Sequence, residues 1–199
     1  AFGALAIFIV LLAIYSRSPY PAFAQHSPAQ PVPYNHQLHA GGLQIDCRYC
    51  HASVEVSASA SIPPTQTCMT CHSQIKTDSP ALQPVRDSWA SGKPIEWVRV
   101  HDLADFVYFN HSIHVAKGVG CSTCHGRIAE MVQVQQVQPL TMGWCLDCHR
   151  EPQKYLRPQS EIYNTLWEPP ADQLAQGQAL VEQNNIKVDR LTNCTICHR

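Results

Sequence analysis

The stretch Cys121-Ser122-Thr123-Cys124-His125 follows a pattern, Cys-x-x-Cys-His, that occurs five times in this chain of 199 residues. The five copies, called motifs 1 to 5 in chain order, use all ten cysteines. They are Cys47, Cys50 and His51; Cys68, Cys71 and His72; Cys121, Cys124 and His125; Cys145, Cys148 and His149; and Cys194, Cys197 and His198. In this pattern two thiols attach one c-type haem, and the histidine becomes the proximal ligand of its iron. We therefore predict five covalently bound haem c groups.

Two other uses of the ten cysteines fit the pattern less well. Five disulfides would give no reason for a histidine to follow every second cysteine. A structural zinc site pairs one Cys-x-x-Cys with a second, distant pair, and the adjacent histidine points poorly at the same metal. With every cysteine assigned to haem, we expect no disulfide.

The composition favours a fold built around cofactors. The chain has 15 prolines and few long periodic runs. We predict a multihaem cytochrome c fold with little regular secondary structure, in which short helices surround five haems. The formal net charge is −1 and only 15% of the residues are charged, so nothing points to nucleic acid.

The amino-terminal segment is strongly apolar. Residues 1–14 carry no charge, and the first charged residue is Arg17. A bilayer span needs about 20 apolar residues, so we predict that residues 1–18 form a transmembrane anchor whose start is truncated. The alternative is a cleavable signal peptide, because Ala22-Phe23-Ala24 resembles a cleavage site.

A proline-rich stretch at residues 19–33 is predicted to be an extended tether. It leads to a pentahaem domain at residues 34–199. Because covalent haem is attached on the outer side of the bacterial membrane, we expect this domain on the periplasmic face of the inner (plasma) membrane.

The haem domain repeats itself. Tyr34-Asn35-His36-Gln37-Leu38-His39 precedes motif 1, and Phe109-Asn110-His111-Ser112-Ile113-His114 precedes motif 3. Each copy continues to a second motif, and matching parts lie 74 to 77 residues apart. We interpret residues 34–75 and 109–152 as two dihaem modules, followed by a fifth haem segment at residues 153–199.

The two His-x-x-His pairs are candidates for distal iron ligands. Residues i and i+3 of a helical turn project from nearly the same face, so the pair can reach two neighbouring irons. We expect the first histidine, His36 or His111, to face its own downstream motif, and the second, His39 or His114, to face a neighbouring haem. The fifth distal ligand is His101 or Met142; a thioether ligand raises the reduction potential relative to imidazole.

Longer phrases resemble a known family. Residues 105–114, 120–127 and 142–150, together with the apolar start and the five motifs, are similar to the pentahaem cytochrome c component of alternative complex III. The His-x-x-His pairs also resemble class III multihaem cytochromes. The first resemblance implies a membrane quinol oxidoreductase with a molybdopterin-enzyme-like iron–sulfur subunit, polytopic quinol-binding subunits and a monohaem cytochrome c.

These observations predict an electron-transfer subunit that relays electrons from quinol to a periplasmic acceptor and does no substrate chemistry itself. One alternative is a small membrane-anchored quinol dehydrogenase. Another is a multihaem reductase, which needs one iron with an open coordination position.

Overall fold

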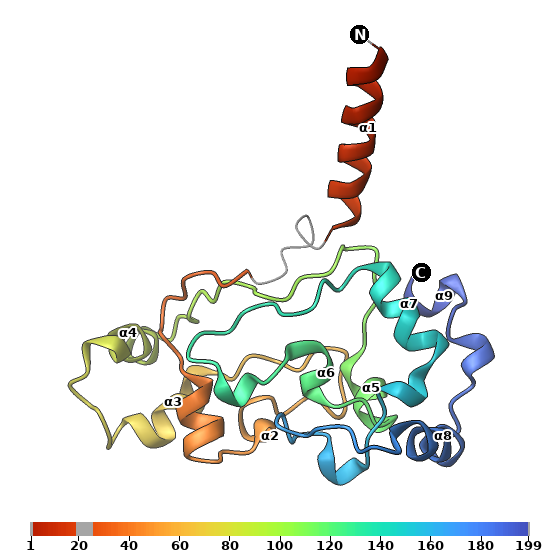
Figure 1. The fold of residues 1–199 in the computed structure, drawn as a ribbon. Helices are drawn as coiled ribbons and strands as arrows, with labels where there is room; N and C mark the ends of the chain where they lie inside the picture. The colour runs from red at the N-terminus through yellow and green to blue at the C-terminus, as the bar shows by residue number, and fades with distance from the viewer. Residues whose placement is uncertain (1, 19–25, 199) are drawn as a thin grey trace.

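The computed structural model describes residues 2–18 and 26–198 of the chain, as short helices joined by long irregular segments (Figure 1). The α-helices are α1 (Phe2–Arg17), α2 (Cys47–Cys50), α3 (Thr65–His72), α4 (Gln83–Ser91), α5 (His111–Ala116), α6 (Cys121–His125), α7 (Met142–Arg150), α8 (Gln173–Gln183) and α9 (Cys194–Cys197). The 3₁₀ turns are η2 (Pro80–Leu82), η3 (Ile128–Glu130), η4 (Pro152–Lys154), η5 (Gln159–Glu161) and η6 (Val188–Arg190), and η1 (Gln37–Gly42) is a π-helical turn.

The part of the chain that the structure describes contains no β-strand. Its one isolated bridge is antiparallel and joins Val119 to Leu156. α3 and α4 lie at one end of the haem domain, and α7, α8 and α9 lie at the other (Figure 1). The prediction of short helices with little other regular structure is therefore confirmed.

The apolar start of the chain forms one helix, α1, of 16 residues. The membrane anchor at residues 1–18 stays a prediction. Among the described residues, no helix has both the length and the apolar character needed for a membrane span. The large apolar side chains of α1 are nevertheless exposed, as Phe8 and Leu11 illustrate.

The predicted tether divides into two parts. Residues 19–25, which include Ala22-Phe23-Ala24, lie outside the described residues. Residues 26–33 pack onto the haem domain: the Gln30 amide donates to the Val98 carbonyl at 2.8 Å and accepts from the Val98 N–H at 3.0 Å. Val32 is buried. This stretch is held by side-chain contacts that its proline content does not reveal.

The side-chain core is small for a chain of this length. Its cluster of buried residues comprises Val54, Val115 and Ile162, with Ala60 and Tyr163 packed against it. These residues come from three distant parts of the chain and join the segment after motif 1 to α5 and to residues 162–163. Many other large apolar side chains are exposed to solvent in the polypeptide alone.

α8 packs closely on η4 through a glycine. A Cβ at Gly177 would overlap the backbone carbonyl of Gln153. The Gln173 amide adds hydrogen bonds to the carbonyls of Gln153, at 3.0 Å, and Leu156, at 2.8 Å. The contact holds the segment before motif 5 against the segment after motif 4.

Gly177→Ala should lower the free energy of unfolding of the holoprotein by about 1–3 kcal/mol, because the added methyl group forces two backbones apart. In a helix, alanine is more favourable than glycine by about 1 kcal/mol. A net loss of stability in Gly177→Ala must therefore come from the steric effect. Denaturant unfolding followed by far-UV circular dichroism measures it. Gly3→Ala is the control, since a Cβ there meets nothing within 4 Å. Equal or greater stability of Gly177→Ala would contradict the close packing.

Candidate haem-binding sites

Each of the five motifs begins or lies within a short helix: α2, α3, α6, α7 and α9. Local capping helps to start two of them. The Asp46 side chain accepts from the Arg48 N–H at 2.8 Å at the start of α2, and the Thr141 hydroxyl accepts from the Trp144 N–H at 3.4 Å at the start of α7. A helical turn brings cysteines i and i+3 to one face, with the histidine next to the second thiol.

The motif histidines are held through their Nδ1 atoms. In four motifs Nδ1 lies within hydrogen-bond distance of a backbone carbonyl oxygen: His51 to Ser61 at 2.7 Å, His72 to Ile75 at 3.2 Å, His149 to Leu191 at 2.9 Å and His198 to Phe106 at 3.0 Å. A carbonyl can only accept, so Nδ1 carries the proton and Nε2 keeps its lone pair. Metal-bound histidines are oriented in this way by their outer partners.

The repeated sequence aromatic-Asn-His-x-x-His has a repeated geometry. The Tyr34 ring stacks on His39, with centroids 4.5 Å apart, and meets His36 edge-on at 4.7 Å. In the second copy the Phe109 ring does the same, at 4.5 Å from His114 and 4.8 Å from His111. One aromatic side chain therefore orients both imidazoles of each pair. This role was not predicted from the sequence, although the aromatic residue at the start of both copies could have indicated it.

The asparagine of each copy holds the second histidine. His39 Nδ1 donates to the Asn35 carbonyl at 2.8 Å, and His114 Nδ1 donates to the Asn110 carbonyl at 2.7 Å. The Asn110 side chain also accepts from the Ser112 N–H at 2.9 Å, which starts α5. The asparagine thus begins the turn and fixes the tautomer of the histidine four residues later.

Three imidazole pairs face each other at a common separation. An imidazole nitrogen lies about 2 Å from its metal, so two rings on opposite sides of one iron have centroids roughly 6 Å apart. The observed centroid separations are 6.2 Å for His39 and His72, 6.2 Å for His114 and His149, and 6.3 Å for His111 and His125. The structure therefore brings predicted distal and proximal histidines together at the spacing that a shared iron requires.

The remaining predicted pair is His36 with His51. Burial and, to a smaller extent, the nearby His51 and His39 lower the pKa of His36 to about 4, so its imidazole is neutral and able to bind a metal. Its Nδ1 is buried and, among the described residues, has no hydrogen-bond partner. In the second copy, by contrast, His111 Nδ1 donates to the Ala58 carbonyl of the first module at 2.7 Å.

The two candidates for the fifth distal ligand are placed differently. His101 lies against His125, with ring centroids 4.3 Å apart, and its pKa is lowered by burial and by His111. Met142 is the first residue of α7 and is 63% exposed. The Cys145 thiol, one turn further along α7, is close enough to Cys197 for the two to interact electrostatically. Met142 is therefore on a helix that approaches motif 5.

The donor set fits covalently bound haem. All ten cysteines have free thiols. Burial raises the pKa of Cys124 to about 12 and that of Cys121 to about 11, which is opposite to the lowered pKa of reactive cysteines. In the described ranges, no three His, Cys, Asp or Glu side chains converge as a metal site requires.

Comparisons with known families agree with this chemistry. Residues 107–199 match the model for cytochrome c7 and related cytochrome c, and residues 15–95 match the model for the class III cytochrome c family. Each match covers one of the two predicted dihaem modules and includes its motifs and its pair of histidines. Together the two matches support a multihaem cytochrome c similar to the class III and c7 types.

This cytochrome is also similar to a curated protein. It is 28% identical over 118 residues to "Menaquinone reductase, multiheme cytochrome c subunit" from Nitratidesulfovibrio vulgaris strain Hildenborough. The match covers 59% of this chain and 55% of the relative, so the chain spans about half the length of that protein. The haem count of five and the resemblance to alternative complex III stay predictions.

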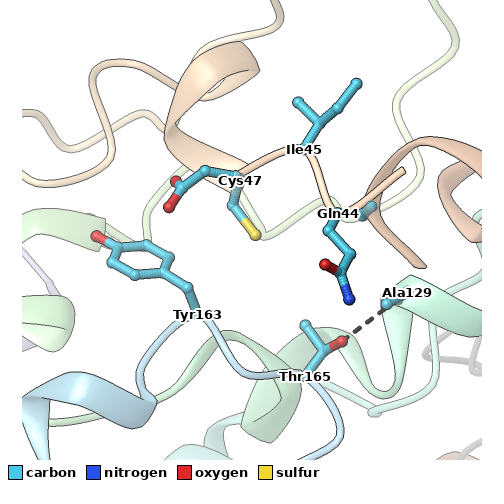
Figure 2. Close-up of a pocket in the computed structure, with 8 residues that line it drawn as sticks. Gln44, Ile45, Cys47, Ala129, Tyr163 and Thr165 are labelled. Atoms are coloured by element: carbon cyan, nitrogen blue, oxygen red, sulfur yellow. Dashed lines mark hydrogen bonds between the residues drawn. The ribbon is translucent and has the colours of Figure 1, made fainter. Parts of the chain in front are cut away.

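A cavity of about 280 Å³ opens beside motif 1 of the cytochrome. Figure 2 shows the Cys47 sulfur directed into it, between Tyr163 and Gln44. On its far side the Thr165 hydroxyl accepts from the Ala129 N–H at 3.4 Å. The cavity therefore lies beside one of the two predicted attachment thiols of motif 1.

Arg157 supports motif 3 from behind, and no pattern in the sequence indicated this role. The side chain is only 4% exposed. Its guanidinium donates to the hydroxyls of Ser122 and Thr123, inside motif 3, at 3.1 and 3.2 Å. It also donates to the Asn164 carbonyl at 3.1 Å and lies 4.4 Å from the centre of the Trp167 ring.

The backbone brings Arg157 to this position. The Arg157 N–H donates to the Gly118 carbonyl at 2.9 Å, next to the Val119–Leu156 bridge. Gly120, directly before motif 3, lies so close that a Cβ there would overlap the guanidinium. The glycine and the arginine are therefore one packing unit behind the haem attachment helix.

Arg157→Gln should lower the free energy of unfolding of the cytochrome by about 1–3 kcal/mol, because buried carbonyl and hydroxyl groups lose their donor. Denaturant unfolding of the holoprotein measures this effect. Lys154→Gln is the matched control, since it removes an exposed ion pair with Glu151 that contributes little to stability. Indistinguishable unfolding of the two variants would show that Arg157 does not hold motif 3.

Proposed function

We propose that this cytochrome is the electron-transfer subunit of a quinol-linked respiratory assembly. The observation that carries the proposal is the pairing of imidazoles across a separation of 6.2–6.3 Å at motifs 2, 3 and 4. Paired imidazoles close both axial positions of an iron, which suits electron transfer and leaves no place for a substrate. The similarity to a menaquinone reductase cytochrome subunit supplies the link to quinol.

We assign the ligands as follows. The proximal histidines are those of the five motifs, and the distal histidines are His36, His39, His111 and His114. The fifth distal ligand is His101 or Met142, and the position of Met142 on α7 favours the thioether. When bound, the haems supply reversible one-electron chemistry at iron; the chain supplies the axial ligands, orients them and excludes water.

The reductase alternative needs an open iron. Among the described residues, no ring contact joins a candidate distal histidine to His51 or to His198, so motifs 1 and 5 are where an open iron would be sought first. A methionine ligand at motif 5 would close that iron and support the relay. The dehydrogenase alternative needs a quinol site within this one chain, whereas the cavity beside Cys47 lies at a predicted haem attachment thiol.

The direction of electron flow has two candidates. The predicted role is quinol oxidation, with a periplasmic acceptor receiving the electrons. The name of the relative instead describes a menaquinone reductase, in which electrons enter the quinone. The proposed ligands and the fold are compatible with either direction of electron flow. The direction is set by the reduction potentials of the electron donor and the electron acceptor.

We further propose that the cytochrome works at the outer face of the bacterial inner membrane with partner subunits. α1 presents exposed apolar side chains, and Gly3, Ala4 and Ala6 allow other helices to approach closely. The proposed partners are an iron–sulfur molybdopterin-oxidoreductase-like subunit, polytopic quinol-binding subunits and a monohaem cytochrome c, as in alternative complex III.

Alanine substitution of His36, His39, His111 or His114 should each open one iron and produce one high-spin signal in the electron paramagnetic resonance spectrum. Denaturing mass analysis should still show five covalent haems, because the attachment thiols are unchanged. His26→Ala is the control, since no ligand role is proposed for it. Fully low-spin spectra in all four variants would refute the ligand assignment.

Purification in mild detergent should yield this cytochrome within a larger complex, because a chain whose irons are closed needs partners to supply and remove electrons. Menaquinol should reduce its haems, or a reduced periplasmic carrier should reduce menaquinone, rapidly in the complex and slowly in the isolated chain. Stopped-flow absorbance at the haem bands measures both directions. Rapid quinol oxidation by the isolated chain would favour the dehydrogenase alternative.

A further inference from the structure

The histidine of motif 3 is held differently from the other four. His125 Nδ1 lies 3.3 Å from the Nε2 atom of His101, where the other motif histidines face a backbone carbonyl oxygen. The two rings are nearly perpendicular, at 79°, with centroids 4.3 Å apart. The two ring nitrogens are within hydrogen-bond distance, and on His125 the contact is made by Nδ1, which leaves Nε2 for the metal.

His111 is a second imidazole neighbour of His125. The rings of His111 and His125 are almost parallel, at 7°, with centroids 6.3 Å apart. The other two facing pairs, His114 with His149 and His39 with His72, have interplanar angles of 24° and 64°. His125 thus contacts two imidazoles: the ring that shares its proposed iron and the ring that lies near its Nδ1.

We propose that His101 is a positioning residue for the proximal ligand of motif 3, and that it does not bind iron. Its Nε2 accepts the hydrogen bond of His125 Nδ1–H and so fixes the tautomer and the plane of the His125 ring. This inference rests on the haem ligation proposed above and deepens it, because it assigns a separate role to one of the two candidates for the fifth distal ligand.

Both ligands of this one iron are then fixed through Nδ1. His111 donates to the Ala58 carbonyl at 2.7 Å, and His125 donates to His101. An imidazole nitrogen is a more basic acceptor than an amide oxygen, and a stronger outer partner raises the basicity of the ligand that it orients. His101 therefore stabilises the oxidised state of the iron and lowers its reduction potential.

The segment that carries His101 is anchored on both sides. Arg99 forms an exposed ion pair with Asp102 at 2.7 Å across the bend that contains His101. Upstream, the Gln30 side-chain amide donates a hydrogen bond to the Val98 carbonyl and accepts one from the Val98 N–H. The imidazole is thus presented to His125 from a constrained segment.

The hydrogen bond from His125 also changes the assignment of the fifth iron. With its Nε2 engaged in this bond, His101 does not serve as the partner of His198. Met142 is the other candidate, on the helix whose Cys145 thiol interacts with that of Cys197. A histidine–methionine iron at motif 5 has a higher potential than the bis-histidine irons of the other motifs.

The test uses the full haem-loaded chain with His101→Gln and His101→Leu. Glutamine places an amide oxygen close to the position of Nε2, so it can accept the hydrogen bond, but it cannot replace an imidazole as an iron ligand. Leucine removes the acceptor. The readouts are the haem count by mass analysis, the spin state by electron paramagnetic resonance, and the five midpoint potentials by spectroelectrochemical titration.

We expect His101→Gln to keep all irons low-spin with nearly unchanged potentials. His101→Leu should also remain low-spin, but one midpoint potential should shift upward and the low-spin signal of one bis-histidine iron should change. A new high-spin signal in His101→Gln would show that His101 is an iron ligand and overturn the proposal. Unchanged potentials and spectra in a fully loaded His101→Leu variant would also overturn it.

The glutamine variant decides the question even where the leucine variant fails to mature. Met142→Leu, prepared in parallel, should lose the high-potential haem, whereas His101→Gln should retain it. None of these measurements uses quinol, so a failure of this inference leaves the proposed function untouched. The proposed function fails separately, on the quinol assay of the complex.

Discussion

The hydrogen bonds at Nδ1 of the five motif histidines are the interactions on which this fold depends. The motif helices are only about one or two turns long, too short to be stable by themselves. Some of their histidines bond to acceptors far along the chain, as His149 does to Leu191 and His198 to Phe106. These bonds leave Nε2 available to a metal and join a motif to a distant segment, so ligand geometry and the path of the chain are set together.

The chain needs this arrangement because its side-chain core is small. Val54, Val115 and Ile162 form one modest cluster, and in the described ranges no strand provides a backbone ladder. A chain of about 200 residues normally buries a large share of its apolar surface. Covalent haems supply large apolar surfaces to such a chain, and folding is then coupled to cofactor attachment, as it is in small metal-dependent domains.

The two modules reach the same ligand geometry by different backbone routes. Tyr34 and Phe109 orient their histidine pairs in nearly the same way, yet the first pair lies at the start of a π-helical turn and the second on an α-helix. The modules also support each other, since His111 bonds to the Ala58 carbonyl between motifs 1 and 2. The local sequence thus determines the geometry within each His-x-x-His pair. Packing between the modules determines how the pair is oriented in the fold.

The haem chemistry, the repeat and the short helices could all be deduced from the order of the residues. Cysteine spacing is a covalent requirement of one porphyrin, so the five motifs could be identified without any fold. The His-x-x-His pairs followed from helical periodicity and from their duplication. Contacts between distant residues became visible only in the folded chain: Arg157 behind motif 3, Gln30 bonded to Val98, and His101 against His125. A lone histidine or arginine carries no periodicity or spacing, so its partner is decided only when the chain is folded.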